Sequence, residues 1–129
     1  MIAEVHHISI LIRSEETIEF YKILGFREIL RKSRDNDIVV ILEGYGIQLE
    51  VFIDDRHPTR VTDVTEPLGP RHFAFRVDGS LEKEICRLRE VFMEKLQFDP
   101  QFGDIGKDWI GEQYVFFKDP DGNVLELHE

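Results

Sequence analysis

The sequence has a single cysteine, Cys86, so the chain cannot form a disulfide within itself. It also lacks any apolar run near the length of about 18 residues that a membrane-spanning helix requires. Its first residues, MIAEVHH, contain neither the basic region nor the apolar core of a signal peptide. These absences predict a cytoplasmic protein without a membrane span.

Positive charge is also scarce, with 16 lysines and arginines against 26 aspartates and glutamates and a net charge of −10. A surface of this sign repels phosphates, so neither nucleic acid nor an anionic membrane is an expected partner. The remaining composition is ordinary, with 42% hydrophobic and 33% charged residues. At 129 residues the chain is long enough for one globular domain with its own core, over residues 1–129.

The first half of the chain, about residues 4–53, has the pattern of a β-α-β-β-β module. Apolar residues at helical spacing follow Ser14, which is a good N-cap, and Gly25 is a typical helix stop. Side chains that alternate between apolar and polar indicate strands around this helix. Four strands are expected, at 4–12, 26–32, 37–43 and 47–53.

The second half, about residues 71–129, repeats this pattern after a polar linker at about 54–70 that contains three prolines. Its expected elements are a strand at 71–77, a helix that begins after the N-cap Ser80, a strand somewhere within 97–113, and a closing hairpin at 114–128. The sequence therefore predicts an α+β fold built from two tandem β-α-β-β-β modules.

On one face of its sheet each half carries a histidine at its first strand and a glutamate in its last, namely His7 and Glu50, then His72 and Glu126, whereas His6 falls on the other face. All four lie opposite the apolar row that has to pack on a helix, so they face the open side of the sheet. Imidazole and carboxylate groups without a thiolate suit a divalent transition metal such as Zn, Ni, Co, Mn or Fe. A single histidine or glutamate in a strand is more often solvated, but recurrence at matching places favours a metal site.

Three stretches, HHISI, RHFAF and FFKDPDGNVLELHE, resemble the vicinal oxygen chelate superfamily. Its members include glyoxalase I, methylmalonyl-CoA epimerase, extradiol dioxygenases, fosfomycin resistance enzymes and bleomycin-binding proteins. The resemblance implies a curved, partly open barrel-like sheet with helices on the outer face. It also implies ligands on the first and last strands of each module, which here are His7, Glu50, His72 and Glu126.

Glyoxalase I has His, Glu, His and Glu in this order, whereas the epimerases typically have Gln at the second place, and dioxygenases and fosfomycin enzymes use two His and one Glu. The ligand set thus implies a lactoylglutathione lyase-like enzyme with one divalent metal per site. Its small-molecule substrate would be the hemithioacetal of a 2-oxoaldehyde, and Glu50 or Glu126 would take the α-proton while an enediolate is stabilised.

Arg76, on the face of His72, is a candidate for balancing an anionic substrate. Leu11 and Asp54 stand where bacterial glyoxalase I has an Arg and an Asn that hold glutathione, which argues against glutathione as the thiol.

Several alternatives stay open at this point. The chain could be a metal-dependent epimerase or thiol transferase of the same superfamily, or a resistance-type protein that binds a small molecule without chemistry. Retention of both glutamates favours an enzyme, because a binder needs no base. The resemblance also implies a homodimer, in which the site lies within one chain or is shared between two, and the linker at 54–70 is long enough for either.

Overall fold

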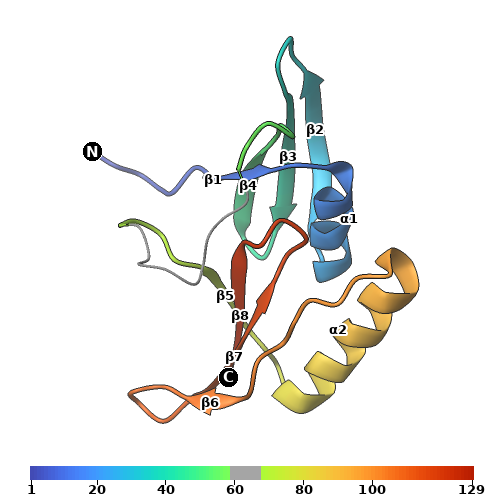
Figure 1. Ribbon diagram of the computed structural model, residues 1–129. Coiled ribbons are helices and arrows are strands. Elements are labelled where there is room, and N and C mark those ends of the chain that lie inside the picture. The colour runs from blue at the N-terminus through green and yellow to red at the C-terminus, as the bar shows by residue number, and fades with distance from the viewer. Residues whose placement is uncertain (59–67) are drawn as a thin grey trace. The chain divides into compact units, whose positions relative to one another are not determined.

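The computed structural model describes residues 1–58 and 68–129 (Figure 1). It divides into two compact units, Met1–Pro58 and Thr59–Glu129. In the described residues each unit has the order β-α-β-β-β. The first contains β1 (Ile8–Ile12), α1 (Glu15–Leu24), β2 (Arg27–Ser33), β3 (Ile38–Gly44) and β4 (Ile47–Ile53), and the second contains β5 (Phe73–Arg76), α2 (Leu81–Leu96), β6 (Gly106–Lys107), β7 (Gln113–Lys118) and β8 (Val124–His128). The predicted α+β fold with two similar modules is confirmed.

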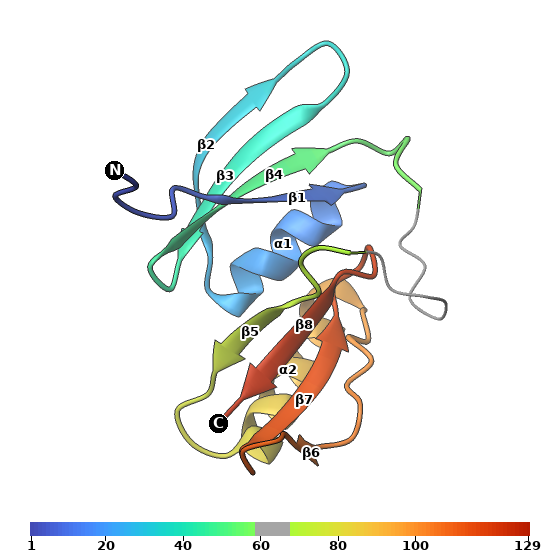
Figure 2. The ribbon, with the colours of Figure 1, turned by 90° about the vertical axis from the view of Figure 1, so that its left-hand side faces the viewer.

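The two sheets have the same topology, with strand orders β1-β4-β3-β2 and β5-β8-β7-β6 (Figure 2). In each sheet the first strand pairs in parallel with the last, and the other neighbours are antiparallel. Ser9 stands opposite Glu50 in one sheet, and Ala74 stands opposite Glu126 in the other. Each sheet stays open, and the described residues form no closed barrel.

The core of the first unit lies between α1 and the apolar face of its sheet. The helix begins after Ser14 and ends at Gly25, whose φ of 119° belongs to the left-handed region that glycine adopts without strain. Its buried residues are Thr17, Ile18, Phe20, Tyr21 and Leu24, and those of the sheet include Val40, Leu42, Leu49 and Val51. Because side chains alternate along a strand, the face of β4 that carries Glu50 is the opposite one.

The second unit repeats this arrangement with α2 along one face of β7 and β8 (Figure 2). The Ser80 hydroxyl accepts a hydrogen bond from the backbone N–H of Lys83 at 3.3 Å and so caps the helix. The buried side chains of this core include Leu81, Ile85, Leu88 and Phe92 from the helix and Val115, Phe117, Leu125 and Leu127 from the sheet. Glu126 again belongs to the other face, although the residue is only 8% exposed.

Three details differ from the sequence-based expectation. The first strand begins at Ile8 instead of residue 4, because its pairing with β4 starts at Ile8 opposite Leu49 and the residues before it are exposed. The strand expected within 97–113 is only two residues long, and it pairs with Gln113 and Tyr114 of β7. Part of the predicted linker, residues 59–67, lies outside the described residues. Among the described helices, none is long and apolar enough to cross a membrane.

Candidate functional site

The first unit places His7 beside Glu50. His7 directly precedes β1, and the parallel register puts it on the same face as Ser9, which is opposite Glu50. His7 Nε2 lies 3.6 Å from Glu50 Oε1, with both side chains about one third exposed. The Nδ1 atoms of His6 and His7 are 2.9 Å apart and their rings meet edge to face, so His6 contacts the His7 ring directly.

The second unit makes the equivalent pair more tightly. His72 Nε2 lies 2.7 Å from Glu126 Oε2, and the two side chains are 23% and 10% exposed. The ring of Phe116, which stands opposite Glu126 on β7, contacts the His72 ring edge to face at a centroid distance of 5.1 Å. Phe116 thus limits the positions open to the His72 ring.

Both pairs have the spacing of neighbouring ligands on one metal ion. Two ligand atoms at right angles on a metal with bonds of about 2.1 Å stand about 3.0 Å apart. The observed separations of 3.6 Å and 2.7 Å lie on either side of this value. The structure therefore brings the four predicted ligand residues together as two equivalent pairs, one in each unit, and their joining around a single ion stays a prediction.

Two apolar side chains lie on the same open face of the first sheet as Glu50. Leu11 is 52% exposed, and its strand partner Phe52 lies on the same face as Glu50. The Arg34 guanidinium stands 5.3 Å from the centre of the Phe52 ring. That guanidinium is bound by both carboxylate oxygens of Asp37, each at 2.6 Å, and this contact raises the pKa of Arg34. The positive charge of Arg34 is therefore already paired with a carboxylate.

Asp54, four residues after Glu50, is also committed to a local partner. Its carboxylate accepts hydrogen bonds from Arg56 Nε at 2.8 Å, Arg56 Nη2 at 2.6 Å and the Arg56 backbone N–H at 3.0 Å. These bonds hold the pKa of Asp54 well below its ordinary value. Asp54 thus presents no hydrogen-bond donor to an anionic substrate.

Arg76, the predicted substrate residue, lies at the end of β5 and is exposed. It stands opposite His128, two residues along from the pair formed by Ala74 and Glu126. It therefore shares the open face of the second sheet with Glu126, as the alternation predicted.

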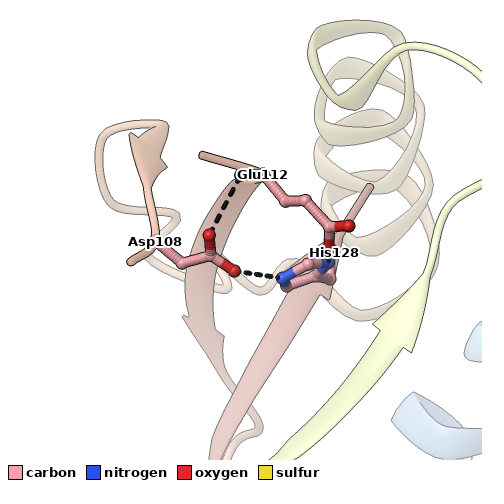
Figure 3. A group of neighbouring side chains, drawn as sticks. All are labelled: Asp108, Glu112 and His128. Atoms are coloured by element: carbon pink, nitrogen blue, oxygen red, sulfur yellow. Dashed lines mark hydrogen bonds and ion pairs between the residues drawn. The ribbon is translucent and has the colours of Figure 1, made fainter. Parts of the chain in front are cut away.

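A second group of polar side chains, Asp108, Glu112 and His128, lies at one end of β8 (Figure 3). His128 Nε2 is 3.1 Å from Asp108 Oδ2, and His128 Nδ1 is 3.4 Å from Glu112 Oε2. The Glu129 carbonyl and then the Asp108 carboxylate raise the pKa of His128. Although burial raises the pKa of Asp108, its hydrogen bonds to His128 and to the backbone of Glu112 and Ile110 bring it below the ordinary value.

Sequence reasoning missed this group. The only signal was the alternation along β8, which puts His128 on the face of Glu126. Asp108 and Glu112 come from the irregular stretch at 97–113, where no periodicity predicts which way a side chain points.

Two open four-stranded sheets of identical topology, each with a His–Glu pair on its free face, define the chain as a protein of the vicinal oxygen chelate superfamily. No protein-family model matches the chain. It is 34% identical over 138 residues to the uncharacterised protein YaeR of Escherichia coli strain K12, which covers 98% of this chain and 95% of YaeR. A glyoxalase family protein from Enterococcus faecalis is 33% identical, with a TM-score of 0.79 over 98% of this chain and 97% of that one. The chain belongs to the glyoxalase family.

Two more distant solved structures share the fold. A variant of the fosfomycin resistance protein FosX from Listeria monocytogenes, in complex with Mn(II) and dihydroxypropylphosphonic acid, is 16% identical with a TM-score of 0.70 over 99% of this chain and 93% of that one. A lactoylglutathione lyase from Agrobacterium tumefaciens is 21% identical with a TM-score of 0.61 over 98% of this chain and 93% of that one.

Proposed function

We propose that the protein is a divalent-metal-dependent, glyoxalase I-like lyase or isomerase that acts on a small substrate with adjacent oxygens, such as the hemithioacetal of a 2-oxoaldehyde. The observation that carries this proposal is the recurrence of a closely spaced His–Glu pair at equivalent positions of the two units. His7, Glu50, His72 and Glu126 would hold the ion, which would be Ni, Zn, Co, Mn or Fe given the imidazole and carboxylate donors. When bound, such an ion supplies Lewis-acid polarisation of a substrate carbonyl.

Glu126 is the better candidate for the residue that moves the proton. Its carboxylate is 10% exposed, whereas that of Glu50 is 30% exposed. A proton taken by a carboxylate with little access to water can be returned to the neighbouring carbon of the substrate before it exchanges with solvent. Glu50 would then act mainly as a ligand. Conversion in D2O gives a direct test, since transfer by Glu126 predicts that much of the product retains the substrate proton.

The thiol part of the substrate is proposed to be uncharged. Leu11 cannot bind a carboxylate, and Asp54 is an anion already held by Arg56. The apolar surface formed by Leu11 and Phe52 next to Glu50 suits an apolar group instead. Arg76 stays the candidate for balancing an anionic group of the substrate.

We further propose that the active protein is a homodimer with sites shared between chains. Each unit supplies only two of the four ligands, so a complete centre needs a first unit and a second unit together. The pairing would join His7 and Glu50 of one chain with His72 and Glu126 of its partner.

A fosfomycin-modifying or other resistance-type activity is the second candidate. The likeness in fold to FosX, solved with Mn(II), supports it, and two histidines with one glutamate are contained within the predicted set as His7, His72 and Glu126. In that case a thiol or water would open the ring of fosfomycin, and Glu50 would not be needed as a metal ligand.

The deciding experiment assays the metal-loaded protein against methylglyoxal hemithioacetals of glutathione and of neutral thiols, and against fosfomycin, with Glu126→Gln and Glu50→Gln as matched variants. The proposal predicts turnover of a neutral-thiol hemithioacetal that Glu126→Gln reduces by at least about a hundredfold through loss of the base, and that Glu50→Gln reduces by about tenfold or more through loss of a charged ligand. Turnover of fosfomycin that persists in Glu50→Gln would favour the second candidate. Binding of a substrate without turnover of any would favour a non-catalytic binding protein.

A further inference from the structure

We propose that Asp108, Glu112 and His128 form a second binding site for a divalent transition metal, distinct from the four ligands assigned above. The three residues offer one imidazole nitrogen and two carboxylate oxygens that all lie within 4.8 Å of one another (Figure 3). They come from one irregular loop and from the end of β8, so both parts of the site belong to the same unit.

The ring of His128 is oriented as a metal ligand requires. Its Nδ1 lies 3.1 Å from the backbone carbonyl oxygen of Glu129, which can accept the Nδ1 hydrogen. Nε2 lies 3.1 Å from Asp108 Oδ2, and a metal ion bound between them would replace the hydrogen that Nε2 donates to this carboxylate in the metal-free protein. Histidines that bind metals usually donate their other ring N–H to a carbonyl or carboxylate in this way, which fixes the ring and the tautomer.

Asp108 is also held so that one oxygen is left for a ligand. Its Oδ1 accepts hydrogen bonds from the backbone N–H groups of Ile110 and Glu112, both at 3.0 Å. The loop is closed by further backbone bonds from Asp108 to Glu112 at 2.9 Å and from Gly111 to Asp108 at 3.1 Å. Only Oδ2 faces His128, and its distance of 3.1 Å from Nε2 matches the spacing of about 3.0 Å for two neighbouring ligands.

Glu112 completes the set after its side chain rotates. Its carboxylate now lies 3.4 Å from His128 Nδ1, the other ring nitrogen, and its side chain is 40% exposed, so it has room to turn toward an ion at Nε2. Ligands on opposite sides of a metal stand about 4.2 Å apart, and the ligand atoms of this group all lie within 4.8 Å of one another. Two carboxylates and a neutral imidazole together carry two negative charges, which balance a divalent ion. A mixed set of nitrogen and oxygen donors favours Zn, Co, Ni or Mn over Mg or Ca.

The position of this site next to Glu126 sets its relation to the predicted centre. Glu126 Oε2 faces His72 at 2.7 Å, while Glu126 Oε1 is 4.0 Å from His128 Nε2. The two oxygens of one carboxylate thus face two different histidines. The group of Asp108, Glu112 and His128 contains none of the four predicted ligands, so the second site does not depend on the proposed function.

The test titrates the metal-free protein with Zn(II) and counts the bound ions per chain after gel filtration. Asp108→Asn is the informative variant, because asparagine keeps an oxygen for the two backbone N–H groups while its amide nitrogen cannot bind the metal. Asp104→Asn, in the same loop but outside the group, is the matched control. We expect Asp108→Asn and His128→Gln to bind one zinc fewer than wild type, and Asp104→Asn to bind the wild-type number. Equal counts for wild type and Asp108→Asn would overturn the proposal.

A second pair of measurements separates this proposal from the proposed function. The double variant His7→Ala/His72→Ala should still bind one zinc through Asp108, Glu112 and His128. If the predicted centre binds no metal, wild type should bind one zinc and Asp108→Asn none, and the second site stands alone. Zn(II) should also shift the ring proton resonances of His128 but not those of His57 in the nuclear magnetic resonance spectrum, and unshifted His128 resonances at saturating zinc would contradict the proposal.

Discussion

The Nε2 atom of His72 lies 2.7 Å from Oε2 of Glu126, although the first residue precedes β5 and the second lies in the last strand of the chain. The contact exists because β5 pairs in parallel with β8 and not with its neighbour in sequence. A metal ion at this place would therefore be held by two segments that are remote in sequence and adjacent in the sheet.

Removing either member of this pair is expected to weaken metal binding at the predicted centre. His72→Ala and Glu126→Gln should each lower the affinity for Zn(II) by a factor of ten or more, because a four-ligand set loses one donor. His57→Ala is the control, since His57 lies outside the set. Competition with a chelator of known affinity measures the change. Wild-type affinity in both variants would contradict the assignment of the ligands.

A shared site predicts complementation between two inactive chains. Glu50→Ala and Glu126→Ala are mixed, unfolded and refolded together. In a mixed dimer with shared sites, one site carries both substitutions and the other carries none, so part of the activity and metal binding should return. Each variant refolded alone is the control. If no activity returns from the mixture, or if the protein sediments as a monomer at micromolar concentration, the shared site is excluded.

The two faces of the sheet should differ sharply in their response to truncation. Leu125 is fully buried, so Leu125→Ala should lower the free energy of unfolding by about 2–5 kcal/mol, as expected when a cavity opens in a core. Leu11 lies on the open face and is 52% exposed, so Leu11→Ala should change it by less than about 0.5 kcal/mol. Urea unfolding followed by circular dichroism measures both. Similar decreases in the free energy of unfolding at the two positions would mean that the assignment of the faces is wrong.

Asp54 should stabilise the protein at neutral pH but not in acid. Arg56 depresses the pKa of Asp54 in the folded state. The contribution of Asp54 to stability is therefore fully present above its pKa in the unfolded state, about 3.9, and is lost as the pH falls through the lower pKa of the folded state. The melting temperature of Asp54→Asn should therefore lie below that of wild type at pH 7, and the difference should shrink from pH 4 toward pH 2. Asp55→Asn, which changes the neighbouring exposed carboxylate, is the control. A difference that stays constant over this range would rule out the Asp54–Arg56 contact as its source.

The sequence predicted most of the fold because local chemistry and global topology agree at many positions. The N-cap Ser80 and the terminal glycine Gly25 fixed one end of each helix, since these residues satisfy backbone groups that a helix leaves unpaired. Strict alternation predicted that Glu50 and Glu126 leave the apolar face, and the parallel pairing of first and last strands then places each beside a histidine.

The parts that escaped prediction are those in which side-chain direction depends on tertiary contacts. β6 is two residues long and follows Gly103, so neither periodicity nor β-propensity marks it. Asp108 faces His128 because backbone N–H groups of its own loop hold one carboxylate oxygen, a geometry that no residue pattern specifies. The start of β1 was placed too early because alternation continues beyond the point at which β4 offers a partner.

In both sheets the strand made last sits between strands made earlier, β4 between β1 and β3, and β8 between β5 and β7. During synthesis the first unit can finish its sheet while the rest of the chain is still being translated. The second unit cannot complete its sheet until β8 has been made, because β8 lies between β5 and β7. A chain whose synthesis stops before β8 thus has a gap between β5 and β7 in its second sheet and lacks Glu126. Assembly of the His72–Glu126 pair therefore waits until the last strand of the second sheet has been synthesised.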